Sequence, residues 1–103
     1  MDWIEIIHLR AHSPRDCMAA VAAFHELTSP ERESGLKEVI LLRNNFIATD
    51  MGIFISWQGG VPANGKSRLG LQLSAAFSEY GQINHYVWAY ETRLAIKQGI
   101  KPN

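Results

Sequence analysis

Residues 60–67 match the pattern G-x-x-x-x-G-K-[ST], which in nucleotide-binding proteins forms a loop that binds phosphate through backbone N–H groups and a lysine. Gly65, Lys66 and Ser67 would be the phosphate-binding residues, since a predicted helix follows directly. Such loops belong to parallel sheets in which a second strand supplies an acidic residue for magnesium. Only one strand is expected after this helix. Phosphate binding therefore stays an alternative to a plain turn in which Lys66 is a surface lysine.

Two histidines lie in segments that are expected to be strands. His85 follows Asn84 in the last strand, and His8 lies in the first. These strands are expected to be neighbours, so the two imidazoles could share a face and act as an acid–base pair or as metal ligands. No third ligand is apparent, because Asp and Glu cluster in predicted loops, and no metal site is predicted. The alternative is two hydrogen-bonded histidines within a sheet.

Aromatic side chains with polar tips are concentrated in the last two predicted strands. Tyr86, Trp88 and Tyr90 alternate along the last strand and share one face, and Trp57 is expected to join them from the strand before. Such a set suits a pocket for a flat, apolar ligand. It suits a dimer interface equally well, so both interpretations remain open.

Hydrophobic periodicity predicts the elements that position these residues. The expected order is a strand over 3–9, a helix over 14–27, a strand over 36–44, a connection over 45–51, a strand over 52–57, a helix over 67–80 and a strand over 83–90. Ser13 is a typical helix N-cap, and Gly81 stands where a left-handed C-terminal cap is expected. Residues 92–103 are expected to form a tail with one or two helical turns ending at Gly99.

The order β-α-β-β-α-β indicates a ferredoxin-like α+β domain, with two helices covering one face of a four-stranded antiparallel sheet. We expect one domain over 1–103, with a core over about 3–91. The strands are apolar on both faces, with Glu5 as an exception. A sheet of this kind requires cover on both sides, so a homodimer through the open sheet face is predicted.

The element order and the runs 53–57 (IFISW) and 84–88 (NHYVW) resemble the dimeric α/β-barrel superfamily, nearest in layout to small proteins grouped with antibiotic-biosynthesis monooxygenases. The resemblance implies a cofactor-independent oxygenase acting on a small aromatic compound, with no bound cofactor. Asn84 and His85 would then position and deprotonate the substrate. Trp57 and Trp88 would stack on it, with Tyr86 and His8 as further ligand-binding residues. The alternative is a non-catalytic ligand-binding or dimeric interaction module.

The bulk composition excludes several other classes of function. Ten Lys and Arg residues balance ten Asp and Glu residues in 103, and no basic block is present, so nucleic acid is not an expected partner. No run reaches the roughly 18 apolar residues of a membrane span, and the N-terminus does not resemble a signal peptide. With Cys17 as its single cysteine, the chain is expected to be cytoplasmic.

Overall fold

The computed structural model describes residues 2–28, 33–97 and 99. The elements in chain order are β1 (Trp3–Ala11), α1 (Pro14–His25), β2 (Leu36–Arg43), β3 (Asp50–Trp57), α2 (Arg68–Phe77), the short 3₁₀ helix η1 (Ser78–Tyr80) and β4 (Gly81–Ala89). This order confirms the predicted β-α-β-β-α-β arrangement.

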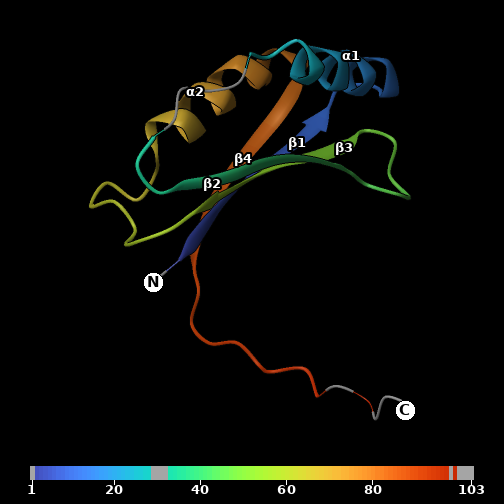
Figure 1. Ribbon diagram of the computed structural model, residues 1–103. Helices are drawn as coiled ribbons and strands as arrows, with labels where there is room; N and C mark the ends of the chain where they lie inside the picture. The colour runs from blue at the N-terminus through green and yellow to red at the C-terminus, as the bar shows by residue number, and fades with distance from the viewer. Residues whose placement is uncertain (1, 29–32, 98, 100–103) are drawn as a thin grey trace.

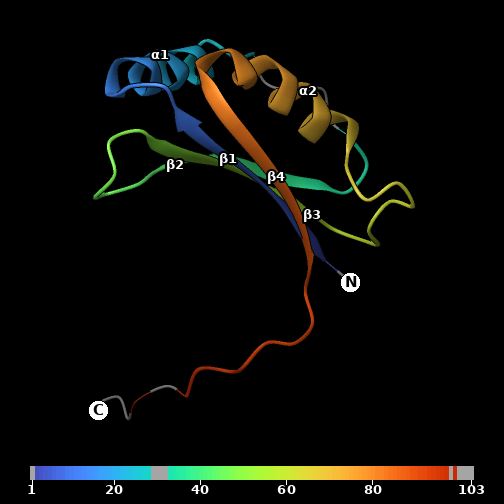
Figure 2. The ribbon, with the colours of Figure 1, turned by 180° about the vertical axis from the view of Figure 1, so that it is seen from behind.

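The four strands form one antiparallel sheet in the order β2-β3-β1-β4. Both helices lie over one face of this sheet, as Figure 1 and the reverse view in Figure 2 show. Within the described residues, no helix covers the opposite face, which we call the open face. The ferredoxin-like α+β fold is therefore confirmed.

Side-chain caps fix where the two helices begin. The Ser13 hydroxyl accepts a hydrogen bond from the N–H of Asp16 at the start of α1, and the Ser67 hydroxyl accepts one from Gly70 at the start of α2. The left-handed cap expected at Gly81 is wrong, because its φ of 162° is extended. Glycine is needed there because an added Cβ would lie 2.6 Å from Ala11 Cα and would overlap the Arg10 carbonyl.

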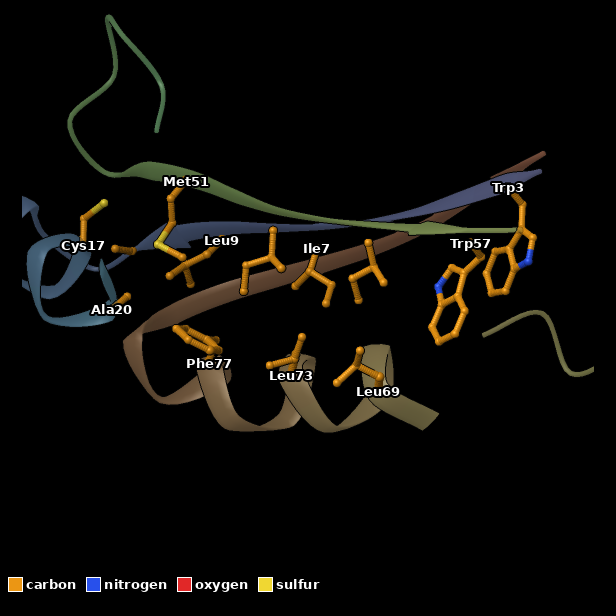
Figure 3. Close-up of a cluster of buried hydrophobic side chains, with 13 residues drawn as sticks. Trp3, Ile7, Leu9, Cys17, Ala20, Met51, Trp57, Leu69, Leu73 and Phe77 are labelled. Carbon is orange, nitrogen blue, oxygen red and sulfur yellow. The ribbon is translucent and has the colours of Figure 1, made fainter. Parts of the chain in front are cut away.

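Alternation along the strands places the hydrophobic core between the sheet and the helices. The buried apolar side chains are Trp3, Ile7, Leu9 and Ala11 of β1, Met51, Ile53, Ile55 and Trp57 of β3, Leu69, Leu73 and Phe77 of α2, and Cys17 and Ala20 of α1. Figure 3 shows the α2 leucines and Phe77 directed at the sheet, with Trp3 and Trp57 side by side at one end of the cluster. This core holds α2 in a fixed position over β1 and β4.

Two segments differ from the sequence-based expectation. β3 begins at Asp50, two residues earlier than predicted, and takes up the end of the expected connection. Residues 92–97 are not helical, so the helical turns expected in the tail are wrong for this part of the chain. The tail leaves the end of β4 and extends away from the helices (Figure 1). No helix among the described residues is long and apolar enough to cross a membrane.

Candidate functional site

His85 lies on the helix-covered face of β4, because it pairs with the inward-facing Ile7 of β1. Its Nε2 lies 3.0 Å from Glu5 Oε1, and its Nδ1 lies 3.2 Å from the Ser74 hydroxyl on α2. A neutral imidazole that donates from Nε2 to the carboxylate accepts at Nδ1 from the hydroxyl. The side chain is only 5% exposed, so both ring nitrogens are used inside the protein.

The carboxylate of Glu5 is completely buried and is the centre of a polar cluster inside the core. Trp57 Nε1 donates to Oε2 at 2.8 Å, and the backbone N–H of Ser67 donates to Oε1 at 2.9 Å. The Ser67 hydroxyl donates to Oε2, and His85 completes the set. We call Glu5, Trp57, Ser67 and His85 the Glu5 cluster. A buried carboxylate is costly unless it is hydrogen-bonded in this way.

The Glu5 cluster joins four elements at one point. It connects β1, β3 and β4 to the residue that caps α2. Among the described residues, every buried side-chain nitrogen and oxygen has a hydrogen-bond partner. Gly70 provides the room, because an added Cβ would overlap Glu5 Oε1 and lie 2.9 Å from His85 Cε1. The cluster therefore fixes where α2 begins relative to the sheet.

This geometry does not favour the phosphate-loop alternative. The N–H and hydroxyl of Ser67 both donate to Glu5, so a carboxylate of the protein occupies the place of a phosphate. Gly65 has the left-handed φ of 80° and its N–H donates to the Pro62 carbonyl. The sheet is antiparallel throughout, whereas the motif belongs to parallel sheets. Of Gly65, Lys66 and Ser67, only Lys66 has a side chain that remains available to a ligand.

His8 and Asn84 lie on the open face, where they pair with each other across β1 and β4. His85 is on the other face, so the expectation that His8 and His85 could share a face is wrong. His8 Nε2 instead lies 3.0 Å from Asp50 Oδ2. Among the described residues, no group of three or more His, Cys, Asp and Glu side chains could hold a metal ion.

Asp50 forms the second polar cluster, at the edge of the open face. Arg10 donates to it twice, from Nε to Oδ1 and from Nη2 to Oδ2, each at 3.0 Å. These hydrogen bonds from Arg10 lower the pKa of Asp50 to about 2, with a smaller contribution from His8 and against the effect of burial. Asp50 is therefore a carboxylate held by Arg10 and His8, which pins the start of β3 to β1.

The aromatic residues do not form the single group expected from the sequence. Tyr86 and Trp88 lie on the open face and are 46% and 56% exposed. Trp57 faces the helices, where its ring stacks on Trp3 at 5.4 Å between centroids with an interplanar angle of 10°. The expectation that Trp57 joins Tyr86 and Trp88 is wrong, because odd-numbered positions of β3 point inward while even-numbered positions of β4 point outward.

A cleft of about 610 Å³ lies between the two helices above β2. Its lining residues are Phe24 of α1, Leu27 and Thr28 just after α1, Glu33 before β2, Val39 of β2, and Arg68, Leu69, Gln72, Leu73 and Ala76 of α2. The walls are mainly apolar, and their charged or amide side chains are those of Glu33, Arg68 and Gln72. We call this the interhelical cleft. Its size and lining are those of a small-molecule site.

None of the residues predicted to be catalytic or ligand-binding lines the interhelical cleft. Half of its lining residues are apolar residues in or just after the two helices, namely Phe24, Leu27, Leu69, Leu73 and Ala76. Arg68 and Gln72 were missed, because an exposed polar residue on a helix carries no mark of a site. Their spacing could have indicated them, because Arg68 and Gln72 lie one turn apart on α2, beside its buried leucines.

The class that the structure defines is the ferredoxin-like α+β fold. Neither a protein-family model nor a curated protein sequence matches the chain. Solved structures do match. SnoaB, a cofactor-independent oxygenase from Streptomyces nogalater, is similar with a TM-score of 0.55 and 15% identity over 90% of this chain and 96% of that one.

Two further similar structures carry the monooxygenase name. A provisionally assigned antibiotic biosynthesis monooxygenase from Bacillus cereus has a TM-score of 0.58 and 11% identity, over 96% of this chain and all of that one (100%). One from Bordetella bronchiseptica has a TM-score of 0.51 and 17% identity, over 91% and 98%. At such identities the likeness establishes a shared fold.

Proposed function

We propose that the chain is a cofactor-independent, monooxygenase-like enzyme that binds a small aromatic compound in the interhelical cleft. The cleft itself carries this proposal, because a mainly apolar space of about 610 Å³ with few polar groups suits one flat ring system. The similarity in fold to SnoaB supports the type of reaction.

Three polar side chains of the cleft have the chemistry that such a reaction needs. Glu33 is the acceptor for a phenolic or ring-carbon proton, and the Arg68 guanidinium stabilises the resulting oxyanion. Gln72 orients the substrate by hydrogen bonding. The electron-rich anion then reduces dioxygen directly. Oxidation of a ring CH₂ group to a carbonyl consumes one O₂ and releases one water, so oxygen uptake equals product formed.

Asn84 and His85 have no catalytic role in this proposal. Asn84 is on the open face, and His85 is bound to Glu5 and Ser74 on the side of α2 away from the cleft. His85 acts instead as a structural residue of the Glu5 cluster.

Oxygen uptake with a panel of phenols and anthrone-type compounds tests the proposal. Ala76→Trp should block the cleft and abolish uptake, since Ala76 is exposed and lines it. Ala75→Trp is the matched control, because Ala75 is exposed on the same helix without lining the cleft. Loss of uptake in both variants, or in neither, would contradict the assignment of the cleft.

The alternative at the same cleft is ligand binding without turnover. It predicts saturable binding of aromatic compounds, weakened by Ala76→Trp, with no oxygen uptake by any compound in the panel. Calorimetry and an oxygen electrode on the same samples separate the two.

We also propose that two copies of the chain pack through their open faces. The support is the exposed apolar surface there, made by Ile40, Leu42, Tyr86 and Trp88, which are 38–56% exposed. Exposed apolar surface of this kind marks an interface, and a self-complementary one closes as a symmetric dimer. Sedimentation should give a dimer that Trp88→Asp converts to a monomer. Met18→Asp is the control, because Met18 is 51% exposed on α1, away from this face.

A further inference from the structure

A second hollow adjoins the interhelical cleft at the start of α2. It has a volume of about 310 Å³ and shares Glu33 and Arg68 with the cleft, so the two spaces are neighbours. Its other lining residues are Trp3, Ser34, Trp57, Gln58, Gly60, Pro62, Asn64, Lys66 and Ser67. We call it the tryptophan hollow. A ligand longer than one ring system could occupy both spaces at once.

The charges around the tryptophan hollow favour an anion. Lys66 and Arg68 are two cations, and Glu33 is the single anion of the lining. Neither cation forms an ion pair with another side chain in the part of the chain that the structure describes. The side chains that line the hollow therefore carry a net positive charge beside an aromatic wall.

The cations are carried by a backbone that is already fixed. Lys66 stands between Gly65, whose N–H donates to the Pro62 carbonyl, and Ser67, whose N–H and hydroxyl donate to the buried Glu5. Arg68 is the first residue of α2. A charged group on a fixed backbone loses less conformational freedom on binding a ligand than one on a free loop.

The wall of the hollow is the stacked pair of Trp3 and Trp57. The Trp57 N–H is bonded to Glu5, so this indole offers its edge and face rather than a hydrogen bond to a ligand. The polar groups that the lining offers an occupant are those of Lys66 and Arg68, the amides of Gln58 and Asn64, the Ser34 hydroxyl and the Trp3 indole N–H.

We propose that the tryptophan hollow binds the anionic group of an aromatic acid whose ring lies in the interhelical cleft. This inference rests on the proposed function and specifies its ligand as a carboxylate-bearing phenolic compound. A carboxylate fits better than a phosphate ester, because Glu33 repels a dianion more strongly than a singly charged group. The groups of Ser67 that could supply further donors are used by Glu5.

Three probes of similar ring size test the inference by calorimetry: naphthol, hydroxynaphthoate and naphthyl phosphate. The same titrations can be followed by fluorescence in a Trp88→Phe variant, in which Trp3 and Trp57 are the remaining tryptophans. Hydroxynaphthoate should bind about tenfold more tightly than naphthol, as expected for charge-assisted hydrogen bonds, and should quench this fluorescence. Its affinity should fall as salt is raised, whereas the affinity of the neutral naphthol should not.

The Lys66→Ala variant tests the hollow alone, because Lys66 lines the hollow and not the cleft. It should weaken hydroxynaphthoate about tenfold and leave naphthol unchanged. Lys97→Ala removes the same charge from the exposed tail and should change neither affinity.

The outcomes distinguish this inference from the proposed function. Equal affinities for naphthol and hydroxynaphthoate would overturn the anion site and leave the cleft as a neutral-ligand site. Tighter binding of naphthyl phosphate than of hydroxynaphthoate would overturn the carboxylate assignment. Failure of all three probes to bind would overturn both proposals.

Discussion

Replacing Gly70 by alanine should destabilise the protein, although the same change normally stabilises a helix. Gly70 lies in the first turn of α2 with its Cα against the Glu5 cluster. An added Cβ would overlap Glu5 Oε1 and would lie 2.9 Å from both Glu5 Cδ and His85 Cε1. Neither neighbour is the free end of a flexible side chain, since Glu5 accepts four hydrogen bonds in a fully buried position.

The expected magnitude is the balance of three effects. Alanine gains about 1 kcal/mol over glycine in helix propensity. Overpacking costs about 1–3 kcal/mol, and each displaced buried hydrogen bond costs about 1–3 kcal/mol. With one or two hydrogen bonds of the cluster disturbed, Gly70→Ala should lower the free energy of unfolding by about 2–4 kcal/mol. For a domain of this size the melting temperature would fall by roughly 10–20 °C.

A double-mutant cycle with Glu5→Ala tests the cause. Removing the carboxylate leaves its donors unpaired and should cost about 3–5 kcal/mol, but it also removes the nearer of the two side chains that the new methyl meets, the other being His85. Gly70→Ala should therefore cost much less in the Glu5→Ala background. The interaction free energy from urea unfolding should be about 2 kcal/mol or more. If Glu5→Ala does not fold, the shorter Glu5→Asp provides the background.

Two results would refute this reasoning. Gly70→Ala could raise stability as an ordinary helical substitution does, or its cost could be the same with and without Glu5. Gly60→Ala is the control, because nothing lies within 4 Å of the added Cβ there. It should change stability by less than about 1 kcal/mol.

Further predictions concern acid, nucleotide and thiol chemistry. Because Arg10 lowers the folded-state pKa of Asp50 from 3.8 to about 2, the stability that Asp50 contributes is complete above about pH 5 and is lost as pH falls toward 2. Asp50→Asn should remove this dependence and cost about 1 kcal/mol at neutral pH once solvent screening is allowed for, as urea midpoints across the range will check. Magnesium-ATP should leave the melting temperature unchanged; a rise that Lys66→Ala abolishes would restore the phosphate loop. Cys17, 1% exposed, should react with a thiol reagent only after unfolding.

The fold could be predicted because its signals are local. The cap at Ser13, the helical spacing of Leu69 and Leu73 and the alternation along the strands each depend on a few neighbouring residues. The element order then leaves few ways to build a sheet. The errors fall where the local signal is ambiguous, at the start of β3, at Gly81 and in the tail after β4.

The site could not be predicted in the same way, because it depends on which face each strand residue takes relative to its neighbours. His8 and His85 are both strand residues, and nothing local tells whether they meet. The periodicity of β1 did mark Glu5 as an exception on an apolar face. A lone carboxylate among inward-facing positions is the signal of a buried hydrogen-bonded cluster, and it was available in the sequence.

Once the register of the sheet is known, the Glu5 cluster follows from it. Glu5 pairs with Ile55 on β3 and with Val87 on β4. Trp57 and His85 are each two residues from those partners, so they are the diagonal neighbours of Glu5 on the same face, within reach of long side chains. A slip of one residue in either pairing would move that strand's donor to the open face and leave the buried carboxylate without one of its four hydrogen bonds. Besides anchoring α2, the cluster therefore selects the register, and a disrupted cluster should cost the fold its uniqueness as well as its stability.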